Sequence, residues 1–134
     1  MFNLKLFGHQ NWNPIKQGFL TVLLSIFIIV IGICFKKSPQ TIWNLSLAPI
    51  LLFGFLNPVC FIFFSNQKKY IPLSVLIFFG LLIVNYSFGI FFTDNFKDNY
   101  MANMLIYQLF VVFFMLIYII AGLFKGIVYI LENN

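Results

Sequence analysis

The chain has 134 residues and a net charge of +5, and 62% of its residues are hydrophobic while only 8% are charged. Soluble domains carry about 25% charged residues, so this composition excludes a water-soluble globular domain. It indicates an integral membrane protein whose lysines set its topology and contact anionic lipid heads. We therefore expect the lipid bilayer, and no nucleic acid, among its partners.

Four stretches of the chain reach the length of about 20 mostly apolar residues that a membrane-spanning helix needs. None of them contains Asp, Glu, Lys or Arg, and they cover residues 18–35, 43–65, 70–92 and 104–124. The links between them are short, which makes consecutive helices antiparallel neighbours. The sequence predicts an all-α integral membrane protein with four antiparallel transmembrane helices, forming a single domain over residues 1–134.

The segment before the first span is polar, yet it holds several large apolar side chains, including Trp12. We expect it to lie in the membrane interface and to end before Pro14. The first span is followed by “FKKSPQ” without a small-residue cleavage site, so it is not expected to be removed as a signal. The single histidine, His9, has no carboxylate or thiol near it in sequence and is a poor candidate for a ligand or a base.

The second span carries two prolines, Pro49 and Pro58. Proline lacks a backbone N–H and pushes against the carbonyl four residues earlier, which for Pro58 belongs to Gly54. We expect helix kinks at these positions, and the freed carbonyls need partners from neighbouring helices. Two interpretations of the adjacent Asn57 remain open. It belongs either to a bent packing helix or to a polar pocket for a ligand or ion.

Polar side chains within the spans predict two layers of interhelical hydrogen bonds. With a rise of about 1.5 Å per residue, Ser25 in the first span reaches the level of Asn57 in the second. Asn85 in the third span reaches the level of Gln108 in the fourth. Such bonds are expected to hold the helices together.

Tyr107 and Tyr118 of the fourth span and Tyr129 after it are each eleven residues apart. Eleven residues are almost a whole number of helical turns, so these side chains form one stripe along a helix that we expect to continue past the span. “GLFKG” lies beside the stripe and permits close approach of another helix. Intramolecular packing with interfacial anchoring is one interpretation, and a contact surface for a partner protein is the other. The candidates for that contact are Tyr107, Tyr118, Gly122, Lys125, Gly126 and Tyr129.

The distribution of lysines predicts the orientation of the chain. With both termini on the same side, that side carries five lysines, whereas the opposite side carries three (Lys36, Lys37 and Lys97) and both aspartates. Lysine-rich loops stay in the cytoplasm, so both termini are expected there, in a bacterial cytoplasmic membrane.

The spans contain no acidic or basic residue, and the chain shows no catalytic triad, metal-ligand spacing or phosphate-binding loop. We therefore expect no enzyme activity, cofactor or metal. The leading hypothesis is a non-catalytic accessory subunit of a larger membrane complex, which stabilises or positions a partner subunit that carries the activity. The alternative is a small transport or ligand-binding protein, possibly homo-oligomeric, that uses the bend at Asn57 and Pro58 as its polar site.

Overall fold

The computed structural model describes residues 13–63, 67–92 and 100–133, and within these ranges all regular secondary structure is helical. The interfacial segment expected before Pro14 and the aspartates of the last link lie outside the described residues. The helices, in chain order, are α1 Pro14–Cys34, α2 Pro39–Ser46, α3 Ala48–Phe63, α4 Gln67–Phe92 and α5 Tyr100–Asn133.

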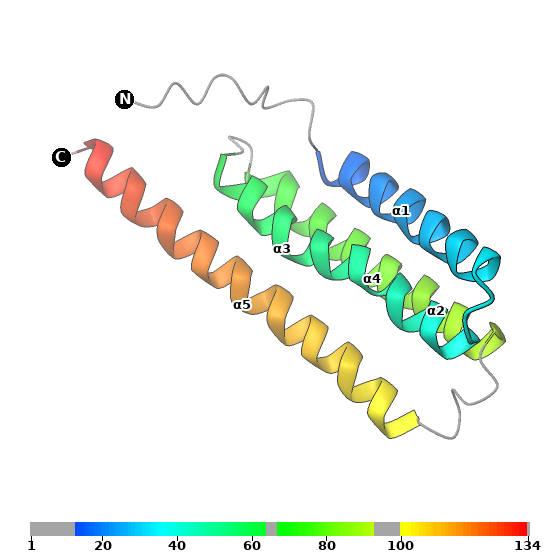
Figure 1. Ribbon diagram of the computed structural model, residues 1–134. Helices are drawn as coiled ribbons and strands as arrows, with labels where there is room; N and C mark the ends of the chain where they lie inside the picture. Colours follow the sequence, from blue (N-terminus) through cyan, green and yellow to red (C-terminus); the bar gives the residue numbers. More distant parts are fainter. Residues whose placement is uncertain (1–12, 64–66, 93–99, 134) are drawn as a thin grey trace.

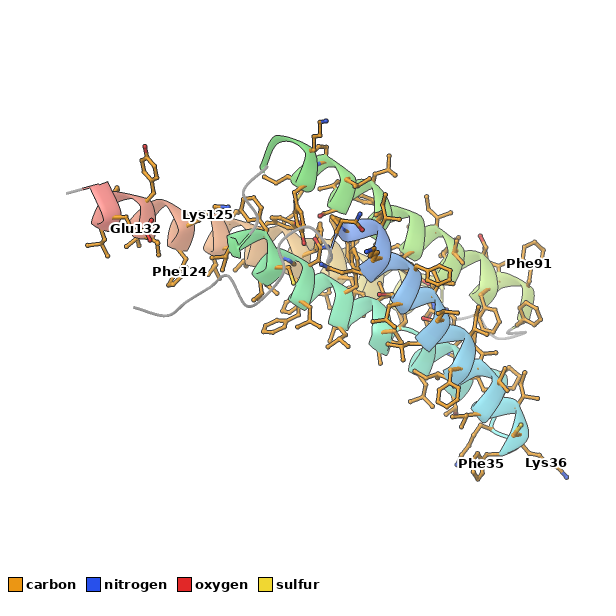
Figure 2. The ribbon with its side chains drawn as sticks, turned by 90° about the horizontal axis from the view of Figure 1, so that it is seen from above. Phe35, Lys36, Phe91, Phe124, Lys125 and Glu132 are labelled. Carbon is orange, nitrogen blue, oxygen red and sulfur yellow. The ribbon has the colours of Figure 1, made fainter. Side chains whose placement is uncertain are left out.

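The helices run back and forth along one long axis (Figure 1). Helix α1 contacts α2, α3 and α4, whereas α5 packs chiefly on α3. Seen from above, Phe35, Lys36 and Phe91 lie toward one end of the molecule, and Lys125 and Glu132 lie at the other (Figure 2). Helix α5 is thus attached to the rest of the molecule along one side only.

Four helical segments are long and apolar enough to cross a membrane, which indicates a multi-pass membrane protein. They cover Pro14–Cys34, Pro39–Ile62, Lys69–Phe92 and Met101–Glu132. Each of the four predicted spans therefore corresponds to one such helical segment, but the first two segments begin four residues earlier than expected, at prolines. The expected helical extension after the fourth span is also present, because α5 continues without interruption to Asn133.

Proline explains both early starts, because it suits the first turn of a helix, where its missing N–H would have no partner. Pro14 follows Asn13, whose side chain accepts a hydrogen bond from the backbone N–H of Lys16 at 2.9 Å. Pro39 follows Ser38, whose hydroxyl oxygen accepts from the backbone N–H of Thr41. Both helices are therefore capped by the residue before the proline.

The second span is interrupted at Leu47, between α2 and α3. Pro49 lies in the first turn of α3 and cannot donate to the carbonyl of Leu45, so the continuous backbone ladder stops there. Leu47 itself keeps helical dihedral angles, and α2 and α3 run in the same direction on the two sides of it (Figure 1). A kink at Pro49 stays a prediction; what the structure describes at this position is the junction between α2 and α3. Pro58 is fully buried inside α3, which is assigned as helix on both sides of it.

Two glycines of α1 allow close helix packing that the sequence analysis missed. A Cβ atom added at Gly18 would lie 2.5 Å from Cγ2 of Ile77 in α4, and one at Gly32 would lie 2.7 Å from Cγ1 of Ile42 in α2. These glycines share one face of α1 with Thr21 and Ser25 at roughly heptad spacing. This stripe of small residues was readable in the sequence, and it lets α1 lie close to its neighbours.

We predict that Gly18→Ala lowers the free energy of unfolding by about 1–3 kcal/mol, because the added methyl group overpacks against Ile77, whose β-branched side chain is stiff. The matched control is Gly80→Ala in α4, where an added Cβ meets no atom within 4 Å. That change should be neutral or slightly stabilising. Unfolding of both variants in detergent micelles tests this, and equal stability of the two would contradict the close contact at Gly18.

The apolar core lies between α2, α3, α4 and the inner side of α5. Its centre is the parallel stack of Phe78 on Phe114, whose ring centroids are 4.0 Å apart. Trp43 is fully buried in the same core, and its ring centroid lies 6.3 Å from that of Tyr107. The aromatic contacts therefore attach α5 to α2 and α4.

Candidate functional site

Asn57 is fully buried in α3 and forms hydrogen bonds with residues of three other helices. Its side-chain N–H donates to Oε1 of Gln17 in α1 at 2.8 Å, and its side-chain oxygen accepts from the hydroxyl of Tyr118 in α5 at 2.6 Å. Tyr70 in α4 donates to the backbone carbonyl of Asn57 at 3.1 Å. The Asn57 cluster, defined as Gln17, Asn57, Tyr70 and Tyr118, therefore joins all four spans.

The Asn57 cluster closes on itself, because Nε2 of Gln17 also donates to the hydroxyl oxygen of Tyr70 at 3.2 Å. Gln17, Asn57 and Tyr70 are buried, and Tyr118 is half-buried. Buried amides without partners are costly in a medium that cannot hydrogen-bond, so this closed arrangement removes a large penalty. The geometry is that of interhelical attachment, with no acid or base in it to transfer a proton.

A second cluster forms around Asn85 in α4. Its side-chain N–H donates to the hydroxyl oxygen of Ser46 at 2.8 Å, and its side-chain oxygen accepts from the hydroxyl of Tyr107 at 2.8 Å. Ser46 in turn donates to the carbonyl of Trp43 at 2.7 Å. This Asn85 cluster repeats the pattern of the first one, since an asparagine amide again accepts from a tyrosine of α5.

The two predicted polar layers exist, but their members differ from the expected pairs. Ser25 does not pair with Asn57. Its hydroxyl donates to the backbone carbonyl of Ser46 at 3.4 Å and so belongs beside the Asn85 cluster. Gln108 does not pair with Asn85 either, because it is exposed on α5 while Tyr107 points inward. The predicted depth of Ser25 was wrong, because Ser25 lies at the level of Ser46 while Gln17 lies at the level of Asn57. Gln108 was mispaired for another reason, because depth along a helix does not give the direction of a side chain.

The tyrosine stripe of α5 faces the inside of the molecule over most of its length. Tyr107 and Tyr118 use their hydroxyls on the two asparagines, so neither is available as a partner-contact residue. Tyr129 lies farther along and is 69% exposed. The eleven-residue spacing predicted one shared face, and the structure assigns that face to intramolecular packing at Tyr107 and Tyr118.

Lys125 is also turned inward, toward the end of α3. Its Nζ donates to the backbone carbonyl of Phe61 at 3.1 Å and lies 4.8 Å from the centroid of the Phe61 ring. The last carbonyls of a helix lack partners within the helix and carry partial negative charge. Lys125 therefore caps the C-terminal turn of α3 instead of extending to a partner protein.

Gly122 and Gly126 remain as surface features of the predicted contact. Both are exposed, and a Cβ added at either would meet no atom within 4 Å. They therefore have no packing role within the described part of the chain.

An apolar groove of about 760 Å³ lies between α4 and α5. Its walls come from both helices, and Gln108 supplies the amide among them; the lining residues are Phe79, Leu82, Ile83, Tyr86, Met104, Tyr107, Gln108, Val111 and Val112. Helix α5 packs chiefly on α3, and it meets α4 through the Phe78–Phe114 stack and the hydrogen bond from Tyr107 to Asn85.

Sequence reasoning missed three members of these clusters, namely Gln17, Tyr70 and Ser46. The predicted spans began at residues 18 and 70, so Gln17 fell just outside the first span and Tyr70 at the end of the third, where a polar group can reach water. The sequence did indicate that Gln17 faces other helices, since Gln17 lies next to Gly18 on the small-residue face of α1. Among the described residues no group of three or more His, Cys, Asp or Glu side chains comes together.

Comparison with protein-family models, with curated proteins and with solved structures finds no match to this chain.

Proposed function

We propose that this chain is a non-catalytic accessory subunit of a larger complex in a bacterial cytoplasmic membrane, where it stabilises or positions a partner subunit that carries the activity. The main support is the contrast between the two sides of α5. The inner side is bonded to both asparagines and to Phe61. The outer side, which includes Gly122 and Gly126, is exposed, and no other described helix packs on those two glycines.

The chemistry of the buried clusters agrees with this proposal. Proton- and ion-coupled membrane proteins use acids or bases inside their spans, and both clusters consist only of amides and hydroxyls. Each asparagine side chain already binds one donor and one acceptor from other helices. A transported ligand at Asn57, as in the alternative function, would have to displace these bonds.

Co-purification tests the proposal. The tagged chain, extracted in mild detergent and analysed by mass spectrometry, should bring the same membrane subunits in fixed ratios from independent preparations. The complex should lose abundance or assembly when the chain is deleted. Recovery of the chain with no stoichiometric partner, and an unchanged complement of complexes after deletion, would refute an accessory role.

We further propose that the four spans cross the bilayer in alternating directions with both termini in the cytoplasm. Single cysteines replacing Lys37 and Lys69, in a chain without Cys34 and Cys60, provide the measurement. An impermeant thiol reagent added to intact cells should label the cysteine at position 37, because that link lies outside. The cysteine at position 69 should be labelled only after permeabilisation. The reverse pattern would invert the orientation, and labelling of both in intact cells would contradict four crossings.

A further inference from the structure

The outer side of α5 carries a continuous heptad pattern. Residues at alternating spacings of four and three lie on one side of a helix and form the contact line of a left-handed helix pair. On the outer side of α5, the nine such positions from Met101 to Tyr129 are all exposed in the folded chain. This α5 seam consists of Met101, Leu105, Gln108, Val112, Met115, Ile119, Gly122, Gly126 and Tyr129.

The composition of the α5 seam differs from that of the rest of the exposed surface of the helix. It holds both glycines of the helix, which permit close approach, and the exposed amide of Gln108. A quarter turn or more away, a parallel line at Phe113, Ile120 and Ile127 carries only bulky apolar side chains. Lipid tails suit that second line, whereas helices in lipid associate through small and polar residues such as those of the seam.

Gln108 gives the seam a hydrogen-bonding requirement. Its side chain is exposed and makes no hydrogen bond to the described part of the chain. It lies about 12 Å along α5 from the first residue of the helix, within the candidate span Met101–Glu132. An amide in hydrocarbon needs a partner, and a second amide is a suitable one because each carries both donors and an acceptor.

We propose that the α5 seam is occupied by the α5 seam of a second copy of this chain, in a parallel pair in which the two Gln108 amides bond to each other. This inference rests on the proposed function, in which other subunits cover the outer side of α5, and it identifies one of those subunits as a second copy of the chain. A twofold axis parallel to the helices places each seam residue opposite its own copy. The seam is uncharged, so pairing with itself brings no like charges together. An antiparallel pair would separate the two Gln108 side chains, since Gln108 is not at the middle of the seam.

The same arrangement fills the groove between α4 and α5. Gln108 and Val112 belong both to the seam and to the groove wall. A helix lying along the seam therefore also faces Phe79 and Ile83 of α4. The single amide in an otherwise apolar seam fixes the register of the pair, as a lone polar residue does at a core position of a coiled coil.

Cysteine cross-linking of the purified, reconstituted full chain tests the pairing. In a chain lacking Cys34 and Cys60, single cysteines at the seam positions 101, 112 and 119 should give disulfide-linked species of twice 15.6 kDa on mild oxidation. Cysteines at the control positions 113, 120 and 127 should give at least tenfold less. Linking at both 101 and 119 requires a parallel pair. Equal linking at seam and control positions, or none at the seam, overturns the proposal.

Substitution of Gln108 tests the amide contact separately. Gln108→Leu should raise the dissociation constant of the pair on the order of tenfold, and Gln108→Asn should retain part of the affinity. An unchanged constant for Gln108→Leu overturns the role of the amide. If the purified chain is monomeric while native membranes give seam cross-links to a different subunit, the second copy is wrong and the accessory function stands. If the purified chain pairs but nothing co-purifies with it, the pairing stands and the accessory function is wrong.

Discussion

Asn57→Ala is expected to lower the free energy of unfolding by about 2–4 kcal/mol. The change removes two side-chain hydrogen bonds, and interhelical bonds of this kind contribute about 0.6–1.7 kcal/mol each in a membrane protein. It also leaves Oε1 of Gln17 and the hydroxyl of Tyr118 without the partners they have in the folded chain. Groups left unpaired in this way add about 1–3 kcal/mol of penalty. Unfolding in mixed detergent micelles, followed by helical content, measures the effect.

The matched control is Asn44→Ala, because Asn44 is exposed on α2 and its side chain bonds only to Gln40 at 3.4 Å. Its effect should stay within about 0.5 kcal/mol. A double-mutant cycle with Tyr118→Phe should give a coupling energy of about 1 kcal/mol, because both changes break the same hydrogen bond. Asn57→Ala with unchanged stability would contradict the closed cluster.

The same substitution separates the two functions considered for this chain. If Asn57 is an attachment point, the variant loses abundance in proportion to its stability, and whatever protein folds still supports the complex. If Asn57 binds a ligand or an ion, function disappears while the protein accumulates at its normal level. We expect the first result. Normal abundance with complete loss of function would favour the transport hypothesis.

The number of spans was predictable because hydrocarbon thickness fixes the length of a spanning helix, and no charge interrupts the four apolar stretches. The helix starts were also readable, since Asn13 before Pro14 and Ser38 before Pro39 are capping pairs. The prediction started both spans at the first apolar run instead. It therefore missed Gln17, whose place in the Asn57 cluster depends on the first turn of α1.

The direction of the fourth helix in the bundle could not be read from its own pattern. Residues eleven apart share a face, but the pattern does not say whether that face is turned inward. In lipid, both sides of a helix are apolar, so the contrast that orients a helix in a soluble protein is absent. Tyr107 and Tyr118 turn inward because Asn85 and Asn57 of other helices lie at their levels. That correspondence depends on helix depths and rotations that only the three-dimensional arrangement supplies.

Gly122→Leu together with Gly126→Leu is expected to leave the protein folded and inserted but to remove its partners. A Cβ at either position meets no atom within 4 Å, and leucine has a higher helix propensity than glycine, so stability should be unchanged or slightly higher. On the outer side of α5, however, two leucines push an approaching helix away. Association in lipid depends on close packing, and loss of that packing is not compensated by burying more apolar surface.

The measurement is co-purification of the tagged variant in mild detergent, with unfolding and membrane insertion recorded in parallel. We expect at least a tenfold loss of bound subunits, including a second copy of the chain, at an unchanged level of the variant itself. The control variant carries Ile120→Phe and Ile127→Phe, which enlarge two exposed side chains of the same helix away from the seam. It should retain every partner, because lipid tails adapt to bulky apolar groups where a closely packed helix does not. If the glycine variant retains the partners of the wild-type chain, the contact surface lies on another helix. If both variants lose their partners, the loss is explained by a general distortion of α5 and not by a contact at the seam.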